Sequence, residues 1–176
     1  KSRWTSTFLL ARVAGKKASK FLLKFLKHPH WMMRTASLKA LLALGEKRFG
    51  DRYAKMLKDK SLIVRVQALE NIRELDLKKY APNVWAMLYD KTNYHEVEGR
   101  HKRADIIKSV ILAIGELGFE KAKKPLLKMA QRKKYEDIYP EVEHALEKLT
   151  GKQAPDSKMH VKRRFWNKVS LESVTL

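Results

Sequence analysis

The chain of 176 residues contains no cysteine, which excludes disulfide bonds, zinc sites built from thiolates and thiol nucleophiles. Its seven glycines form no Gly-rich phosphate-binding loop. No stretch approaches the about 18 consecutive apolar residues of a membrane-spanning helix, so we expect no integral membrane association. The chain begins with Lys1 rather than methionine, which is consistent with removal of either a leader or a larger N-terminal part.

Acidic residues are scarce. There are 39 Lys+Arg against 19 Asp+Glu, and the formal net charge is +20. Such an excess opposes compaction by self-repulsion, and it usually serves attraction to a polyanion such as nucleic acid or an anionic membrane surface. The hydrophobic content of 44% is typical of a globular domain rather than a disordered chain. We expect a cytoplasmic protein, with a processed exported protein as the alternative.

A unit of 31 residues is repeated along the chain. Residues 34–44 align with residues 65–75, and each copy contains two short segments with apolar residues at helical spacing. The apolar residues that coincide are Leu38 with Leu69, Leu41 with Ile72, and Leu44 with Leu75. A fixed period of this size predicts a solenoid of helical hairpins, and therefore an all-α fold.

Four full copies and a fifth partial one account for residues 1–150. The fourth copy is displaced by an insertion near residues 93–103, where we expect a loop or an extended helix end. Residues 151–176 form a second part of the chain: a polar linker, followed by a basic and aromatic tail with an apolar stripe that allows a short helix.

The repeats resemble short HEAT-like repeats of the bacterial type, known from phycobilisome-lyase-type proteins, over roughly residues 3–150. The resemblance is carried by the Val64-Arg65-x-x-Ala68-Leu69 pattern, by Leu-Gly at the end of first helices, and by an aspartate after second helices. It implies a right-handed α-solenoid of about four to five hairpins. First helices would form the convex side and second helices the concave side.

The same resemblance implies a structural ladder between repeats. In this family the recurring arginine pairs with the turn aspartate of a neighbouring repeat. The matching residues are Arg34 and Arg65, with Asp59 and Asp90. In the fourth copy Ile107 replaces the arginine, so we expect the ladder to break beside the insertion.

Cations are concentrated on the second helices. The expected second helices hold 19 basic and two acidic residues, whereas the expected first helices hold 7 basic and four acidic ones. One column is basic in all four copies, and we expect it in opening helical turns, where the macrodipole disfavours cations. Binding of an external ligand would explain why cations are kept where the macrodipole disfavours them. The alternative is that these cations simply form a solvated face. The predicted polyanion-binding residues on these helices are Lys17, Lys24, Arg48, Arg52, Lys55, Lys79, Lys121 and Lys128.

Two further basic clusters extend this prediction. The insertion contains Arg100, Lys102 and Arg103, which we expect to clamp phosphates. The tail interleaves cations with aromatic residues that can stack on bases, and its predicted contacts are Lys162, Arg163, Arg164 and Trp166. As an alternative, the tail is a capping helix that buries its aromatic residues under the last repeat.

The sequence gives little support for a catalytic site or a metal-binding site. His95, Glu96, Glu98 and His101 are close in sequence, but their spacing matches no recognised ligand set, so we predict no metal and no cofactor. The repeat brings no serine and histidine together as a nucleophilic pair.

The favoured interpretation is therefore a non-enzymatic module whose lysine-rich concave face binds a polyanion, most directly DNA or RNA, by phosphate neutralisation. The first alternative is a protein-interaction scaffold for an acidic partner. The second is a HEAT-like DNA glycosylase, although the second helices offer only Glu46 and Asp51 as acids. The sequence does not define the oligomeric state.

Overall fold

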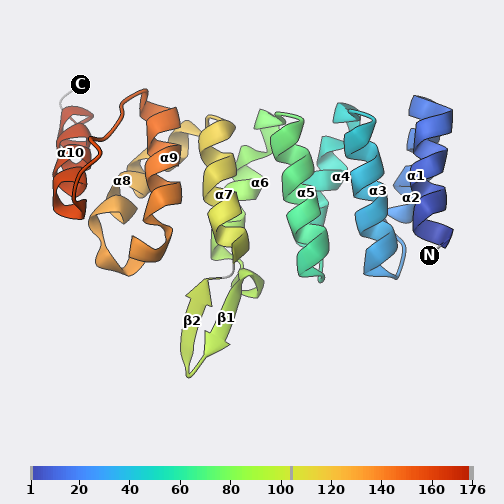
Figure 1. Cartoon of the computed structure of the whole chain (residues 1–176), viewed down its shortest axis with the longest axis horizontal. Helices are drawn as coiled ribbons and strands as arrows, with labels where there is room; N and C mark the ends of the chain where they lie inside the picture. Colours follow the sequence, from blue (N-terminus) through green and yellow to red (C-terminus); the bar gives the residue numbers. More distant parts are fainter. Residues whose placement is uncertain (1, 104, 175–176) are drawn as a thin grey trace. The chain divides into compact units, whose positions relative to one another are not determined.

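The computed structural model describes residues 2–103 and 105–174, without the side chains of residues 2–4, 7, 8, 10 and 100–103. The chain divides into two compact units, Lys1–Met87 and Leu88–Leu176. Both units are built mainly from short α-helices joined by tight turns (Figure 1).

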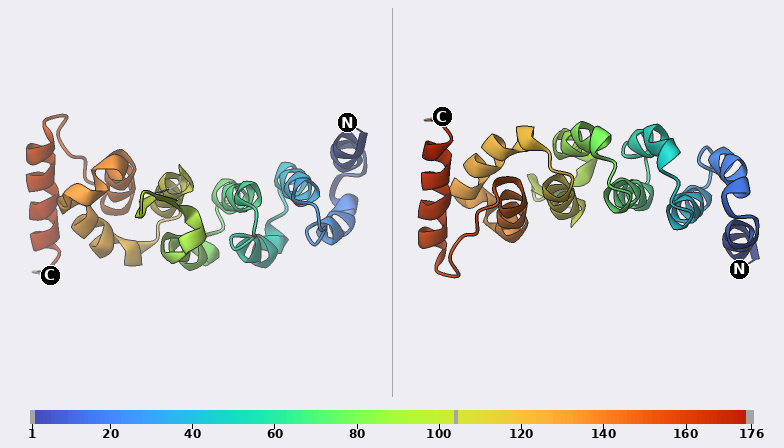
Figure 2. Two further views of the ribbon diagram at one scale, coloured as in Figure 1. Left: turned by 90° about the horizontal axis from the view of Figure 1, so that it is seen from below. Right: turned by 90° about the horizontal axis from the view of Figure 1, so that it is seen from above.

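The first unit consists of three helical hairpins. Its helices are α1 (Ser2–Ala14), α2 (Ser19–Phe25), α3 (Trp31–Ala43), α4 (Gly50–Met56), α5 (Leu62–Glu74) and α6 (Ala81–Ala86). Within this unit the first helices α1, α3 and α5 form one layer and the second helices α2, α4 and α6 form another (Figure 2). Helix α3 packs against α1, α2 and α5, and α4 packs against α5.

The apolar side chains that recur in each repeat form the core between these two layers of helices. Leu22, Leu38, Leu41, Leu57 and Ile72 are fully buried. Burial of a side chain of this size contributes about 1.5–3 kcal/mol relative to exposure. The repeated apolar positions therefore hold consecutive hairpins together.

A residue with left-handed backbone conformation follows the first helix of each of these repeats. Gly45 follows α3 with φ +65°, which glycine adopts without steric cost. One period later Asp76 occupies the equivalent place after α5, with φ +50°. The third repeat therefore carries a strained residue where the second repeat has glycine.

Second helices begin with a turn of 3₁₀ helix. These turns are η1 (Gly15–Ala18), η2 (Lys47–Phe49) and η3 (Lys78–Tyr80) in the first unit, and η6 (Glu120–Ala122) in the second. Further 3₁₀ segments are η4 (Met87–Tyr89), η5 (Lys91–Asn93) and η7 (Lys133–Ile138).

The described residues of the second unit form four α-helices and two strands. They are β1 (Tyr94–Val97), β2 (Arg100–Arg103), α7 (Asp105–Glu116), α8 (Lys123–Gln131), α9 (Tyr139–Thr150) and α10 (Met159–Glu172). Helix α9 packs against both α7 and α8, and α10 packs against α8. Gly115 allows the close approach of α7 to α9, because a Cβ atom there would lie 2.6 Å from the Cα of Ala145.

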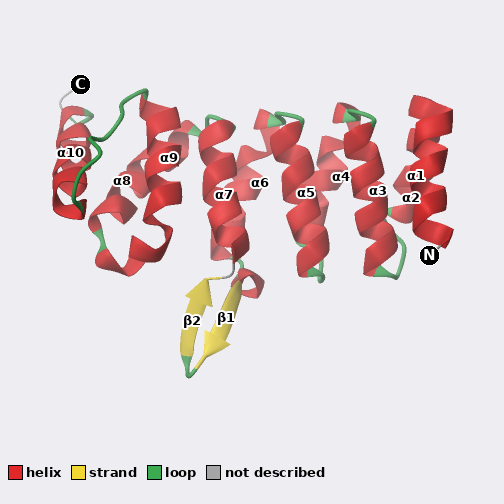
Figure 3. Ribbon diagram, in the orientation of Figure 1, coloured by secondary structure: helices red, strands yellow, loops and turns green. Residues whose placement is uncertain are grey.

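The insertion forms a β-hairpin, so the expected loop or helix extension near residues 93–103 is wrong. The strands β1 and β2 pair antiparallel, with Tyr94 opposite Arg103 and Val97 opposite Arg100 (Figure 3). Glu98 and Gly99 form the turn, and both have positive φ angles, +50° and +70°. Two positive φ angles are typical of a type I′ hairpin turn, whose twist matches that of the strands.

The tail forms the helix α10, as the capping alternative predicted. Trp166 is fully buried, and Val169, also on α10, is buried as well. An indole in this position cannot stack on a base, so the predicted ligand contact of Trp166 is wrong. The residues between α9 and α10 form the irregular connection predicted there, while the boundary at residue 151 stays a prediction.

Candidate functional site

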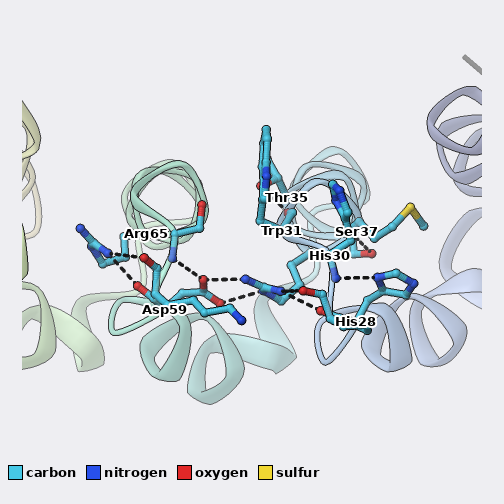
Figure 4. Close-up of polar contacts among 12 residues, drawn as sticks. His28, His30, Trp31, Thr35, Ser37, Asp59 and Arg65 are labelled. Atoms are coloured by element: carbon cyan, nitrogen blue, oxygen red, sulfur yellow. Dashed lines mark hydrogen bonds and ion pairs between the residues drawn. The ribbon is translucent and has the colours of Figure 1, made fainter.

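Arg34 on α3 and Asp59 in the turn before α5 form a largely buried ion pair, and Figure 4 shows Asp59 with its polar contacts. Nε and Nη2 of Arg34 each donate to one carboxylate oxygen of Asp59, both at 2.9 Å. Nη1 of Arg34 donates to the carbonyls of His28 and Pro29 at 2.8 and 2.9 Å. The Asp59 carboxylate also accepts from the backbone N–H of Ser61 at 2.8 Å. The contacts of this pair hold successive turns in register.

Arg65 makes the corresponding contacts one period later. Its Nη1 donates to the carbonyl of Asp59 at 2.8 Å and to that of Lys60 at 3.4 Å. The Asp90 carboxylate lies in the second unit, where it accepts from the N–H and hydroxyl of Thr92 at 2.9 and 2.7 Å. The pairing of Arg65 with Asp90 stays a prediction.

A groove of about 380 Å³ lies between the second helices α2 and α4 of the first unit. Apolar side chains that are buried or half-buried form its floor, and exposed cations form its rim. The floor consists of Leu23, Leu26 and Met56, the rim of Lys24, Lys27, Arg52 and Lys55, and Asp59 lies at one end. We call this site the α2–α4 groove.

The side chains that line the α2–α4 groove carry a net positive charge. The only acid among its lining residues, Asp59, is already paired with Arg34. Lys24, Lys27 and Lys55 have no ion-pair partner among the described residues. Arg52 lies 3.5 Å from Asp51, and both side chains are about half exposed, so water screens that pair.

The repeat position that is basic in all four copies does not line this groove. Lys17, Arg48 and Lys79 lie in 3₁₀ turns before the second helices, not in the opening turns of α-helices, so the predicted dipole penalty is not supported. Arg48 Nη2 is 2.7 Å from a carboxylate oxygen of the buried Glu46. Lys79 lies over the ring of its neighbour Tyr80.

The cations of the second unit are arranged differently. Lys121 and Lys128 are exposed on η6 and α8. Lys162 pairs with Glu143 at 3.0 Å, and the Arg163 guanidinium lies 3.9 Å from a carboxylate oxygen of Glu136. These two pairs tie α10 to its own unit.

The remaining predicted cations are placed as follows. Arg164 is exposed on α10. The side chains of Arg100, Lys102 and Arg103 lie outside the described residues, as does that of His101. In the described part of the chain, no three His, Asp or Glu side chains are grouped closely enough to hold a metal ion.

The sequence prediction named three of the four rim cations but missed Lys27 and the apolar floor. Lys24 and Lys27 are three residues apart, and this spacing places both on one side of a helix. Stepping by one repeat from Lys24 leads to Lys55. Helical spacing combined with the repeat period was therefore a signal for the groove.

Two tyrosine side chains are buried, Tyr53 on α4 of the first unit and Tyr139 on α9 of the second. Burial raises the pKa of Tyr53, and the Glu46 carboxylate raises it further. The Tyr53 hydroxyl donates to the carbonyl of Glu46 at 2.7 Å. Burial likewise raises the pKa of Tyr139, and the Glu143 carboxylate adds to that effect. Both phenols are therefore uncharged groups of the core.

Among the helices that the structure describes, none has the length and apolar character needed to cross a bilayer. No protein-family model and no curated protein matches the chain. A solved structure with the same fold is the complex of CpcE and CpcF of phycocyanin lyase from Nostoc sp. PCC7120, at 18% sequence identity and a TM-score of 0.67. The match covers 99% of this chain and 65% of that chain, so the chain spans about two thirds of the matched one.

This match confirms the predicted HEAT-like helical-repeat fold and the suspected resemblance. It contradicts nucleic-acid binding as the function, because the protein with the same fold works in a complex with another protein. The burial of Trp166 also removes one of the predicted contacts, whereas those of Lys162 and Arg163, which take part in ion pairs, stay predictions. The alternative interpretation, a protein-interaction module, fits these findings better.

Proposed function

We propose that this HEAT-like repeat protein is a protein-interaction module that binds an acidic segment of a partner at the α2–α4 groove. The observation that carries the proposal is the set of four exposed cations around an apolar groove whose one acid is already neutralised. The fold match supports it, since the matched structure is an assembly of two proteins.

The groove offers two kinds of attraction to such a partner. Its rim cations raise the local concentration of an acidic segment and speed association, an effect that salt weakens. Its apolar floor supplies contact area that does not depend on salt. Affinity should therefore fall with added salt and level off above zero.

The test compares two variants with the same loss of charge. In the first, Lys24→Ala and Lys55→Ala remove two rim cations; in the control, Lys39→Ala and Lys148→Ala remove two exposed lysines that do not line the groove. Fluorescence anisotropy with an acidic peptide should show about tenfold weaker binding for the groove variant, because two charge contacts are lost. The control variant should bind like the unmodified protein. Equal loss in both variants would mean that only net charge matters.

Phycocyanin supplies a second candidate partner, because the matched complex is a phycocyanin lyase. A role in a lyase reaction is supported by the fold match, whereas the predicted absence of catalysis stays a prediction. Purified phycocyanin in a pull-down, followed by an assay of its chromophore content, tests both. Binding without any change in chromophore supports an interaction module, and a change in chromophore supports an enzymatic role.

A further inference from the structure

The floor of the α2–α4 groove is the feature that net charge does not explain. Leu26 and Met56 are buried, Leu23 is half-buried, and all three line an open groove of about 380 Å³. That volume lies at the lower end of the range for ligand pockets. A purely acidic chain would contact the rim and leave this apolar surface in water.

The rim cations flank the floor from both helices. Lys24 lies in the last turn of α2 and Lys27 in the turn that follows this helix, whereas Arg52 and Lys55 lie on α4. Arg52 and Lys55 are three residues apart, so both lie on the same side of α4. The helix dipole favours Lys24 and Lys55 in the last turns of α2 and α4 but not Arg52 in the first turn of α4, and it gives no reason for an open apolar floor between the two helices.

The length of the groove sets the size of its occupant. Helices α2 and α4 have seven residues each. At 1.5 Å per residue each helix is about 10 Å long, which matches about two turns of a helix lying between them. Met56 can adapt to anchors of different shape, because its side chain is unbranched and flexible.

We infer that the occupant is an acidic amphipathic helix of a partner protein, whose apolar stripe enters the α2–α4 groove between carboxylates that meet the two rows of cations. This inference rests on the proposed function and defines the partner at that same site. Its geometry is that of a helix in a groove, with apolar anchors at i, i+3 and i+4.

Three peptides of about 14 residues separate this inference from the proposed function. The first has leucines on one helical face and glutamates on both sides of them. The second replaces the leucines by glutamine at the same charge. The third has the composition of the first in a scrambled order that breaks the stripe.

Isothermal titration should show the striped peptide binding at least about tenfold tighter than either control, because each buried leucine adds apolar contact. If all three peptides bind equally, the inference fails and the proposed function stands. If none binds, the proposed function fails. Striped binding that persists undiminished in the Lys24→Ala, Lys55→Ala variant overturns the placement in this groove.

Met56→Gln provides the complementary change in the protein. It should weaken the striped peptide about tenfold and leave the glutamine peptide unchanged, because only the former contacts the floor. Thermal unfolding shows whether this variant still folds. A photo-crosslinker on the peptide's apolar face gives a second measurement in the unmodified protein. Crosslinks mapped to Leu23, Leu26 or Met56 support the inference, and crosslinks confined to other helices overturn it.

Discussion

Asp59 accepts two hydrogen bonds of 2.9 Å from Arg34 and also lies at one end of the α2–α4 groove. One carboxylate therefore takes part both in the register of the repeats and in the lining of the candidate site. Because its charge is matched by a buried guanidinium, Asp59 does not cancel the field of the rim cations. The structural ladder thus helps to keep the groove positive.

Replacing Arg34 by alanine should destabilise the protein by about 3–5 kcal/mol, because the change leaves Asp59 as a nearly buried charge without its partner. The carbonyls of His28 and Pro29 lose their donor in the same variant. Urea denaturation followed by circular dichroism measures the free energy of unfolding. Lys123→Ala is the control, because the Glu120 carboxylate of its ion pair is mostly exposed and the pair should contribute about 0–1 kcal/mol. Similar losses in both variants would show that Arg34 is no more than a surface cation.

The positions of the helices in the first unit follow directly from the repeat. Leu38, Leu41 and Ile72 were superposed by the period, and all three are fully buried. A repeat constrains these positions strongly, since each copy must bury the same face against its neighbours. The pairing of Arg34 with Asp59 followed from a family resemblance, which carries contacts that periodicity alone does not define.

The features that escaped prediction depend on local geometry. The hairpin around Glu98 and Gly99 has no copy elsewhere in the repeats, although a glycine between two short segments was a turn signal. The α2–α4 groove is lined by side chains of two separate helices, among them Leu23 and Met56, and the size of such a gap depends on packing in three dimensions. The burial of Trp166 could not be distinguished from exposure, because one apolar stripe serves a capping helix and a binding helix equally well.

Asp76→Gly should stabilise the protein by about 0.5–1 kcal/mol. Asp76 follows the end of α5 with φ +50°, a conformation that costs an L-residue free energy and that glycine adopts freely. Its carboxylate lies 3.9 Å from Lys78 with both side chains mostly exposed, so little is lost on removing it. Thermal unfolding provides the measurement. The opposite change at the equivalent position, Gly45→Ala, should lower the midpoint, and a lower midpoint for Asp76→Gly would contradict the strain argument.

Stability should decline at alkaline pH through Tyr53. Its pKa is raised above the ordinary value of 10.0, so the folded protein holds the phenol proton that the unfolded chain releases. The contribution of a raised pKa is fully present below about pH 10 and is lost as pH rises beyond it, by up to about 1.4 kcal/mol per pH unit. Unfolding by urea between about pH 8 and pH 11 measures the slope.

Comparison with Tyr53→Phe isolates this effect from the titration of the many lysines. The variant lacks the hydrogen bond to Glu46 and should be less stable at neutral pH, but its deficit should shrink as pH rises. Tyr89→Phe changes an exposed phenol and should follow the unmodified protein throughout. A deficit for Tyr53→Phe that stays constant to about pH 11 would argue against a protonated buried phenol.

Gly115→Ala should destabilise the protein, although alanine favours helices more than glycine does. The propensity gain is at most about 1 kcal/mol, because Gly115 lies in the last turn of α7. Against it, the new Cβ would lie 2.6 Å from the Cα of Ala145, which is backbone in the closely packed helix α9 and cannot turn aside. Forcing the two helices apart costs about 1–3 kcal/mol, so the net change should be a loss. Ser109→Ala, at an exposed position of the same helix, should instead leave stability unchanged or raise it slightly. Chemical denaturation of both variants decides the sign, and a gain in stability for Gly115→Ala would mean that α7 and α9 are not in the tight contact described.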